Sequence, residues 1–257
     1  MLLAIDAGNS NITLGLFREQ ELIAQWRLLT DRERGAEDYG SDLLKLFERT
    51  NIDRKQVDGI AIASVVPQLD PALRQMSEMY LELTPLFVNH TTDTGLKIVY
   101  DSPANVGADR IVDAVAAVAK YGAPCIAVDC GTATTFNVVN EASEYVGGAI
   151  APGLMIAAEA LFARAAKLPR VEIKRPQKVI GSSTIEAMQS GLYYGYTGLI
   201  DGVLERMIAE MQVKPRVIAT GGVAHLLAGA SKFIEVIDET LTLDGLRIVY
   251  DKQNRAR

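Results

Sequence analysis

One short pattern occurs twice in this chain and constrains its fold more than any other feature. An apolar strand ends in an aspartate, a tight polar turn follows, and a second strand leaves the turn. The first copy is LAIDAGNSNITLGLF, Leu3–Phe17, and the second is AVDCGTATTFNVV, Ala127–Val139. Asp6 and Asp129 lie about half a chain length apart, which indicates a duplicated unit.

The apolar patterns around the two copies predict one α/β architecture in both halves. The expected strands are Leu2–Asp6, Thr13–Arg18, Ile23–Leu28, Gly59–Val65, Cys125–Val128, Thr135–Val139 and Tyr145–Ile150, together with the shorter runs PLFV, RVIATGG and FIEVI. The expected long helices are Tyr39–Arg49, Asp70–Leu81, Ala108–Lys120, Leu154–Ala166, Thr184–Met211 and Leu241–Asp251. A duplicated domain is expected to form a cleft between its copies, so that equivalent turns face one ligand.

Composition excludes several function classes. A formal net charge of -6 argues against a nucleic-acid partner, which usually leaves a basic footprint. Cys125 and Cys130 lie roughly 16 Å apart on an extended strand, too far for a disulfide, so we expect reduced thiols in a cytoplasmic protein. With only these cysteines and the separated His90 and His225, no four-ligand Cys/His metal site is expected. No signal peptide and no membrane span is predicted.

The two acidic hairpins have the chemistry of a phosphate-binding site. Glycine with Ser, Thr and Asn offers backbone N–H groups and hydroxyls to phosphate oxygens, and the aspartate offers oxygen to a cation. An ordinary β-turn also favours glycine and asparagine, and this alternative stays open for each hairpin alone. The chain contains no Gly-Lys dipeptide and no Gly-x-Gly, which excludes a Walker A loop and a dinucleotide fingerprint.

These residues resemble a known superfamily. DAGNSNITLGLF and DCGTATTFNVV are similar to the two phosphate loops of the acetate kinase, hexokinase, actin and heat-shock ATPase superfamily. VGADRIVDAVAA, DCGTATTF and GGAIAPG together resemble type III pantothenate kinases, and the resemblance runs from Met1 to about Tyr250. It implies duplicated ribonuclease H-like (actin-like ATPase) domains, residues 1–121 and 122–257, with mixed five-stranded sheets flanked by helices. It also implies ATP-dependent phosphorylation of pantothenate to 4′-phosphopantothenate, the first step of coenzyme A biosynthesis.

Asp109 and Arg110 fall in the first turn of the Ala-rich helix. The helix dipole is expected to keep Asp109 ionised at neutral pH, although an acid at a helix start is also ordinary decoration. The resemblance makes Asp109 the general base that accepts the proton of the substrate hydroxyl. Arg110 forms either a surface pair with Asp113 or a fork for a carboxylate or amide oxygen of pantothenate.

The resemblance also implies the remaining site residues. The nucleotide contacts are Asp6, Ala7, Gly8, Asn9, Ser10, Asn11, Ile12, Thr13 and Thr132. The substrate contacts are Tyr100, Gly107, Ala108, Asp109, Arg110 and Thr184, of which Thr184 is reached from the partner subunit. Relatives often carry a basic residue at position 13, so a side-chain contact of Thr13 with phosphate is in doubt. Asp129 is expected to bind a monovalent cation, K⁺ or NH₄⁺, and Mg²⁺ is expected to accompany ATP.

Three further segments leave alternatives open. Thr184 is also readable as a helix cap near Glu186. Pro152 in GGAIAPG suits the first turn of the following helix. The Gly-Gly of ATGGVA, Ala219–Ala224, either borders the adenosine, as the corresponding turn does in the superfamily, or is required only by the backbone geometry of the turn. The apolar stretch LYYGYTGLIDGVL indicates a buried helix or the interface of a homodimer, which the family forms.

Two other functions compete with the pantothenate kinase. One is a kinase or phosphohydrolase of the same fold that acts on another small metabolite. The other is a non-catalytic nucleotide-binding regulator. His90 and His225 lack any accompanying Ser or Cys nucleophile motif and are expected to be loop or core histidines.

Overall fold

The computed structural model describes residues 1–165 and 167–255, which form two compact units. The first unit is Met1–Ala116 together with the chain from Thr242 onward, and the second is Ala117–Leu241. The expected helix end at Ala166 and the last two residues of the basic tail lie outside the described residues. Among the described helices, none is long and apolar enough to cross a membrane.

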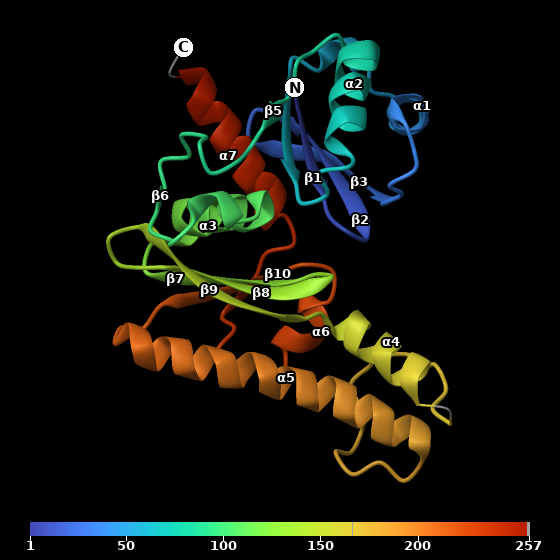
Figure 1. The fold of residues 1–257 in the computed structure, drawn as a ribbon, viewed down its shortest axis with the longest axis vertical. Coiled ribbons are helices and arrows are strands. Elements are labelled where there is room, and N and C mark those ends of the chain that lie inside the picture. The colour runs from blue at the N-terminus through green and yellow to red at the C-terminus, as the bar shows by residue number, and fades with distance from the viewer. Residues whose placement is uncertain (166, 256–257) are drawn as a thin grey trace. The chain divides into compact units, whose positions relative to one another are not determined.

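The first unit is built on a mixed sheet in the order β3-β2-β1-β4-β5. Its strands are β1 (Leu2–Ala7), β2 (Asn11–Arg18), β3 (Glu21–Leu29), β4 (Gly59–Ser64) and β5 (Leu86–Phe87). β1 runs antiparallel to β2 and parallel to β4. The helices are α1 (Ala36–Arg49), α2 (Asp70–Leu81), α7 (Leu241–Arg255) and most of α3 (Ala108–Tyr121), whose residues from Ala117 onward belong to the second unit (Figure 1). Shorter elements are the 3₁₀ turns Arg54–Gln56 and Pro103–Asn105 and the two-residue strand β6 (Lys97–Ile98).

Helices cover both faces of this sheet. Alternate residues such as Ile5 and Leu14 belong to a buried core with residues of α1 and α2. On the opposite face, Gly15 lies so close to Leu243 of α7 that a Cβ atom would approach it to 2.8 Å. The side-chain period of two therefore places Asp6, which alternates with Ile5, on the α7 side of the sheet.

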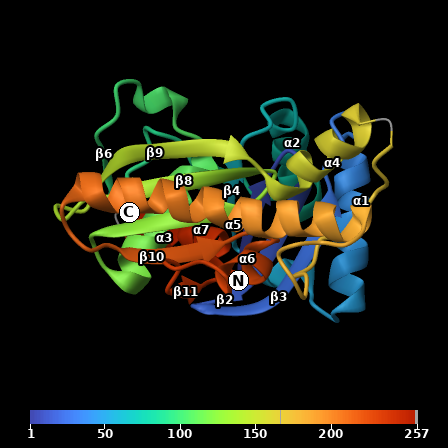
Figure 2. The same ribbon diagram turned by 90° about the horizontal axis from the view of Figure 1, so that it is seen from below.

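The second unit repeats this arrangement. Its strands are β7 (Cys125–Cys130), β8 (Ala133–Val139), β9 (Glu144–Pro152), β10 (Arg216–Thr220) and β11 (Val236–Ile237). They lie in the order β11-β10-β7-β8-β9, and β7 runs antiparallel to β8 and parallel to β10. The helices are α4 (Leu154–Arg164), α5 (Thr184–Met211) and α6 (Ala224–Ala228). α5 runs along one face of the sheet, where Leu192, Tyr196 and Ile200 join its core (Figure 2).

The strand orders confirm the duplication. On one side of β1, and likewise of β7, two successive strands are joined by antiparallel pairing, and on the other side two successive strands are joined by parallel pairing. The expected α/β fold, with a duplicated unit whose mixed sheet is flanked by helices, is therefore confirmed. The expected division between residues 121 and 122 stays a prediction. In the structure, α7 belongs to the first compact unit, because it packs on β2 and α3.

One local prediction is wrong. Pro152 ends strand β9, paired with Ala133, and does not enter the helix, whose N-cap is Gly153. The apolar side chains of the LYYGYTGLIDGVL stretch are largely buried in the core of the second unit, which supports its interpretation as a buried helix.

Candidate active site

The first acidic hairpin closes through its own backbone. The Gly8 N–H donates to the Asn11 carbonyl oxygen at 3.0 Å, and Asp6 lies directly opposite Thr13 across the two strands. Thr30, which follows β3, braces the turn: its Oγ1 donates to the Gly8 carbonyl at 2.6 Å, and its N–H donates to the Ser10 carbonyl at 3.1 Å. The side chains of the turn are left at the surface, where they can meet a ligand.

The second hairpin also closes through the N–H of a glycine two residues after its aspartate, but its turn is shorter. The Gly131 N–H donates to the Ala133 carbonyl, two residues on, at 3.1 Å. Asp129 lies opposite Thr135 on β8 and opposite Thr220 on β10. β1 and β7 also share one burial pattern, in which the aspartate is the single residue that is not buried. The duplication thus presents an accessible carboxylate beside a polar turn in each unit.

Backbone packs tightly against the Asp129 carboxylate. Gly221, in the ATGGVA turn, has φ +90°, and a Cβ atom there would lie 2.3 Å from Asp129 Oδ1. Gly131 also approaches the carboxylate: a Cβ atom on it would lie 3.3 Å from Oδ2. Only glycine combines this backbone conformation with so close an approach. The turn that sequence reasoning assigned to adenosine or to backbone geometry therefore also positions Asp129.

Asp109 is half-buried in the first turn of α3, where its Oδ1 accepts the backbone N–H of Arg110 at 2.7 Å. Loss of contact with water raises the pKa of this carboxyl, and the backbone N–H and the charge of Arg110 offset the rise only in part. Burial therefore has a larger effect on this pKa than the helix N-terminus, and the expectation that Asp109 is ionised at neutral pH stays a prediction. A raised pKa makes the carboxylate a better proton acceptor.

Gly107 and the strand ends connect Asp109 to the first hairpin. A Cβ atom on Gly107 would lie 2.5 Å from Asp109 Oδ1 and 3.4 Å from the side chain of Val65. Val65 follows β4, and its N–H donates to the Ala7 carbonyl at the end of β1 at 3.1 Å. The structure thus brings Asp109 to the same sheet edge as the turn that begins after Asp6.

The expected position of an Arg110–Asp113 pair at the surface is wrong, because both residues are buried. Arg110 is 7% exposed and Asp113 is 1% exposed. The Asp113 Oδ1 accepts the Thr242 hydroxyl of α7 at 2.7 Å. Tyr100, by contrast, is 39% exposed and accessible to a ligand.

Thr184 begins α5 but does not cap it. The cap is Ser183, whose Oγ accepts the Glu186 N–H at 3.2 Å. Glu186 in turn accepts the backbone N–H and the hydroxyl of Ser182 at 2.8 and 2.7 Å, which lowers the pKa of its carboxyl. The exposed Thr184 hydroxyl has no part in this capping arrangement.

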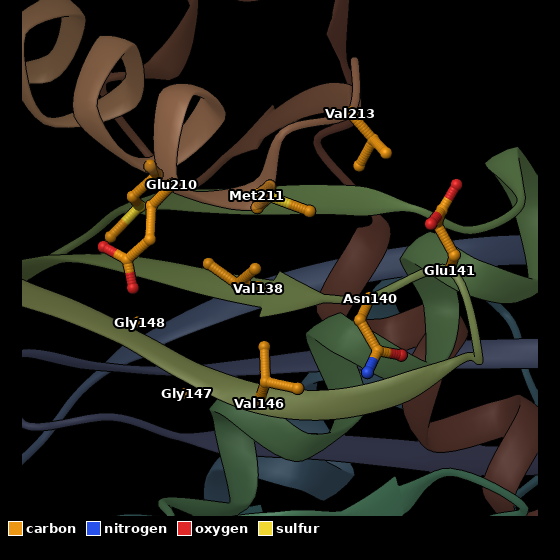
Figure 3. A pocket seen from close by; sticks show the side chains of 10 residues that line it. Val138, Asn140, Glu141, Val146, Gly147, Gly148, Glu210, Met211 and Val213 are labelled. Atoms are coloured by element: carbon orange, nitrogen blue, oxygen red, sulfur yellow. The ribbon is translucent and has the colours of Figure 1, made fainter.

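A pocket of about 360 Å³ lies elsewhere in the second unit. Val138, Val146 and Met211 lie near its centre, while Glu141 and Glu210 lie toward opposite ends (Figure 3). The pocket also includes Gly147 and Gly148 of the GGAIAPG segment, but none of the site residues predicted from the sequence lines it.

The donors near Asp129 suit a hard cation. Asp129 offers carboxylate oxygens, whereas the Gly131 and Thr132 carbonyls of the same turn lie against Gly153. Oxygen donors of this kind bind potassium, ammonium or magnesium rather than zinc. Within residues 1–165 and 167–255, no group of three or more His, Cys, Asp or Glu side chains could hold a metal.

Comparison with known proteins decides the family. A sequence model described as type III pantothenate kinase matches residues 2–206. A type III pantothenate kinase of Koribacter versatilis is 51% identical over 98% of this chain and 96% of that protein. The chain belongs to the type III pantothenate kinase family. The resemblance read from VGADR, DCGTATTF and GGAIAPG is thereby confirmed.

Solved structures with low sequence identity share the fold of this family member. A Baf family transcriptional activator from Campylobacter jejuni aligns with a TM-score of 0.61 at 18% identity, covering 98% of this chain and 99% of that one. An activator of 2-hydroxyisocaproyl-CoA dehydratase from Clostridium difficile, solved with bound ADPNP, aligns with a TM-score of 0.58 at 10% identity, covering 99% and 96%. At such identities the likeness concerns the fold alone.

Sequence reasoning missed Thr30 and a neighbouring arginine. The Arg32 Nη2 donates to Asn9 Oδ1 at 3.0 Å, so the chain after β3 contacts the phosphate turn. The run TDRERGAED contains no motif that predicts this contact, because it depends on how β3 pairs with β2.

Proposed function

We propose that this chain transfers the γ-phosphate of ATP to the 4′-hydroxyl of pantothenate, which forms 4′-phosphopantothenate in the first step of coenzyme A biosynthesis. The observation that carries the proposal is family membership across nearly the whole chain. The local geometry of Asp109 supports it, because phosphoryl transfer to an alcohol needs a group that accepts the hydroxyl proton.

In this reaction Asp109 is the general base. The hydroxyl oxygen of pantothenate forms a bond to the γ-phosphorus as its proton passes to the Asp109 carboxylate, and the bond to the β-phosphate oxygen breaks to release ADP. Gly107 leaves space for the carboxylate, and the Arg110 N–H orients it. We propose that the Arg110 guanidinium binds the carboxylate or amide oxygen of pantothenate. The further substrate contacts proposed are Tyr100, Gly107, Ala108 and Thr184.

The first acidic hairpin supplies most of the proposed contacts with ATP. The proposed nucleotide contacts are Asp6, Ala7, Gly8, Asn9, Ser10, Asn11, Ile12, Thr13 and Thr132. The open polar side chains and braced backbone of the first turn support this assignment. Mg²⁺ accompanies ATP, and Asp129 binds a monovalent cation, K⁺ or NH₄⁺, whose charge offsets that of the phosphates.

The active form is a homodimer in the cytoplasm. The second unit exposes eight large apolar side chains over the end of β9, α4, the chain that precedes α5, and the start of α5, which supports an interface there. They are Ile150, Met155, Ile156, Leu161, Phe162, Val179, Ile180 and Ile185. Cys125 and Cys130 are free and buried, and burial raises the pKa of both thiols to about 12, so they stay protonated and inert. Neither a nucleic acid nor a membrane is a partner.

The decisive experiment measures ADP release by the purified protein with Mg-ATP and pantothenate, in potassium and then in sodium alone. Pantothenate-dependent turnover that requires potassium is the expected result. Turnover in sodium alone at the same rate would overturn the cation assignment and leave the kinase intact. A folded protein that binds ATP but shows no pantothenate-dependent turnover would instead indicate another acceptor or a non-catalytic regulator.

A further inference from the structure

The strand register sets three side chains in one row on the first sheet. Asp6 on β1 lies opposite Thr13 on β2, and Thr13 lies opposite Arg27 on β3. Directly opposed residues of antiparallel strands point to the same face, with Cβ atoms about 4.5–5.5 Å apart. The next pair, Leu14 and Trp26, belongs to the core on the other face. The exposed Arg27 therefore lies on the same face as Asp6, one strand beyond Thr13.

A second arginine contacts the turn itself. Arg32 donates from Nη2 to Asn9 Oδ1 at 3.0 Å, and its side chain is exposed. Arg34, two residues later, is held differently: its Nη2 contacts Asp42 Oδ2 at 2.6 Å, and its guanidinium lies 4.9 Å from the centre of the Tyr39 ring. Of these two arginines, only Arg32 is directed to the turn between β1 and β2.

The charge balance of the turn explains why cations are needed there. A triphosphate remains an anion when Mg²⁺ is bound, and the Asp6 carboxylate adds negative charge to the same row. The polar side chains at positions 9 to 11 and 13 are neutral. Backbone N–H groups supply only partial charges, whereas an arginine supplies a full charge and a planar fork that fits two phosphate oxygens.

We propose that Arg27 and Arg32 bind the triphosphate of ATP, Arg27 from across Thr13 and Arg32 from beyond Asn9. β3 and the loop after it thus supply the positive charge of a phosphate site whose backbone comes from the β1–β2 turn. Because the charge is directed to the β- and γ-phosphates, the two arginines also favour the transition state, in which negative charge spreads over the transferred group. The inference deepens the proposed function and rests on it for the identity of the nucleotide.

The test compares Arg27→Gln and Arg32→Gln with the control Arg18→Gln. Arg18 is an exposed arginine at the far end of β2, opposite Glu21. Its substitution therefore removes the same charge from the same sheet, but at a distance from the turn. Calorimetry measures the dissociation constants of Mg-ATP, Mg-ADP and AMP for each variant. Steady-state kinetics then measures KM for ATP and for pantothenate.

We expect each site variant to bind Mg-ATP about tenfold more weakly or worse, because each loses a charge-assisted hydrogen bond to phosphate. The loss should be smaller for Mg-ADP and absent for AMP, KM for pantothenate should not change, and Arg18→Gln should behave as the wild type. Equal losses for ATP and AMP, or ATP affinities that match the control, would overturn the inference. A wild-type protein that binds Mg-ATP but does not phosphorylate pantothenate refutes the proposed function, while the binding series still decides the role of the arginines. A wild-type protein that binds no ATP refutes both.

Discussion

Asp109 carries out its proposed role at the expense of stability. Burial raises its pKa, so the ionised carboxylate that accepts a proton is disfavoured in the folded protein. We expect Asp109→Asn to lower kcat by about a hundredfold or more, the usual contribution of a general base, with a small change in KM for ATP. Steady-state kinetics of this variant checks the expectation, with Glu78→Gln, which changes an exposed acid on α2, as the control. An unchanged kcat in Asp109→Asn would exclude this residue as the base.

The same substitution should stabilise the fold at neutral pH. The pKa of this acid is higher in the folded state than its unfolded value of about 3.8. Ionisation therefore destabilises the folded state increasingly as the pH rises from 3.8 to the folded-state pKa, and the destabilisation is complete above that pKa. Asparagine bears no such cost. The melting temperature of Asp109→Asn should therefore exceed that of the wild type at pH 7, and the difference should vanish as the pH falls toward 3.8. A variant that is less stable at pH 7 would contradict the raised pKa.

Gly221 offers a test of the cation site. A methyl group at this position would meet Asp129 Oδ1 at 2.3 Å, and φ +90° is unfavourable for alanine. We expect Gly221→Ala to raise the potassium concentration for half-maximal activity and to destabilise the fold by about 1–3 kcal/mol. Gly229→Ala is the matched control, because Gly229 has an ordinary φ of -66° and no neighbour within 4 Å of the added methyl group. Unaltered potassium dependence in Gly221→Ala would separate this turn from the function of Asp129.

At the scale of elements, one buried carboxylate joins the end of α3 to the segment between β11 and α7. Asp238 accepts a hydrogen bond from the Tyr121 hydroxyl at 2.8 Å and forms an ion pair with Lys120 Nζ at 2.6 Å. Burial alone would raise the pKa of Asp238, but Lys120 and Tyr121 together outweigh it and lower the pKa. The Thr240 N–H also donates to this carboxylate, at 3.2 Å, just before α7 begins.

Asp238→Asn should destabilise the protein by about 3 kcal/mol at neutral pH, because the buried ion pair with Lys120 is lost. Because the pKa of Asp238 is lower in the folded state, its ionised carboxylate stabilises the fold at pH values above the unfolded pKa of about 3.8. This stabilisation is lost as the pH falls through the folded-state pKa. The difference in unfolding free energy between wild type and variant should therefore shrink below pH 3.8. Urea unfolding across this range, with the exposed neighbour Glu239→Gln as control, measures it. A difference that does not depend on pH would assign the effect to packing.

The hairpins were predictable from sequence because their turn residues and apolar periods are local. Short elements were not: α6 has five residues and β6 has two, and pairing or packing with distant segments decides whether they form. Pro152 illustrates the same limit, since its placement in β9 depends on pairing with Ala133. The pKa of Asp109 and the contact of Arg32 with Asn9 also depend on tertiary burial and strand pairing, which no local pattern encodes.

At the scale of the whole molecule, the exposed apolar residues of the second unit require a cover. Ile180 is 88% exposed and Ile150 is 65% exposed, values that are costly for a contiguous apolar surface in water. α4 contributes four more exposed side chains and buries only Leu154. In both views it lies beside the N-terminal part of α5, where Thr184 is found (Figures 1 and 2). A second copy of this chain is the proposed cover, because closed two-fold dimers pair a surface patch with itself.

Ile180→Glu tests this cover together with the role of Thr184. A buried, unpaired carboxylate would oppose association, so sedimentation velocity should show a dimer for the wild type and a monomer for the variant. If Thr184 contacts pantothenate from the partner subunit, the monomer should also show a higher KM for pantothenate, with ATP affinity unchanged. Met79→Glu adds the same charge at an exposed apolar residue of α2 and should remain dimeric and active. A wild-type monomer with full activity would refute the dimer, and a monomeric variant with an unchanged KM would remove Thr184 from the proposed contacts.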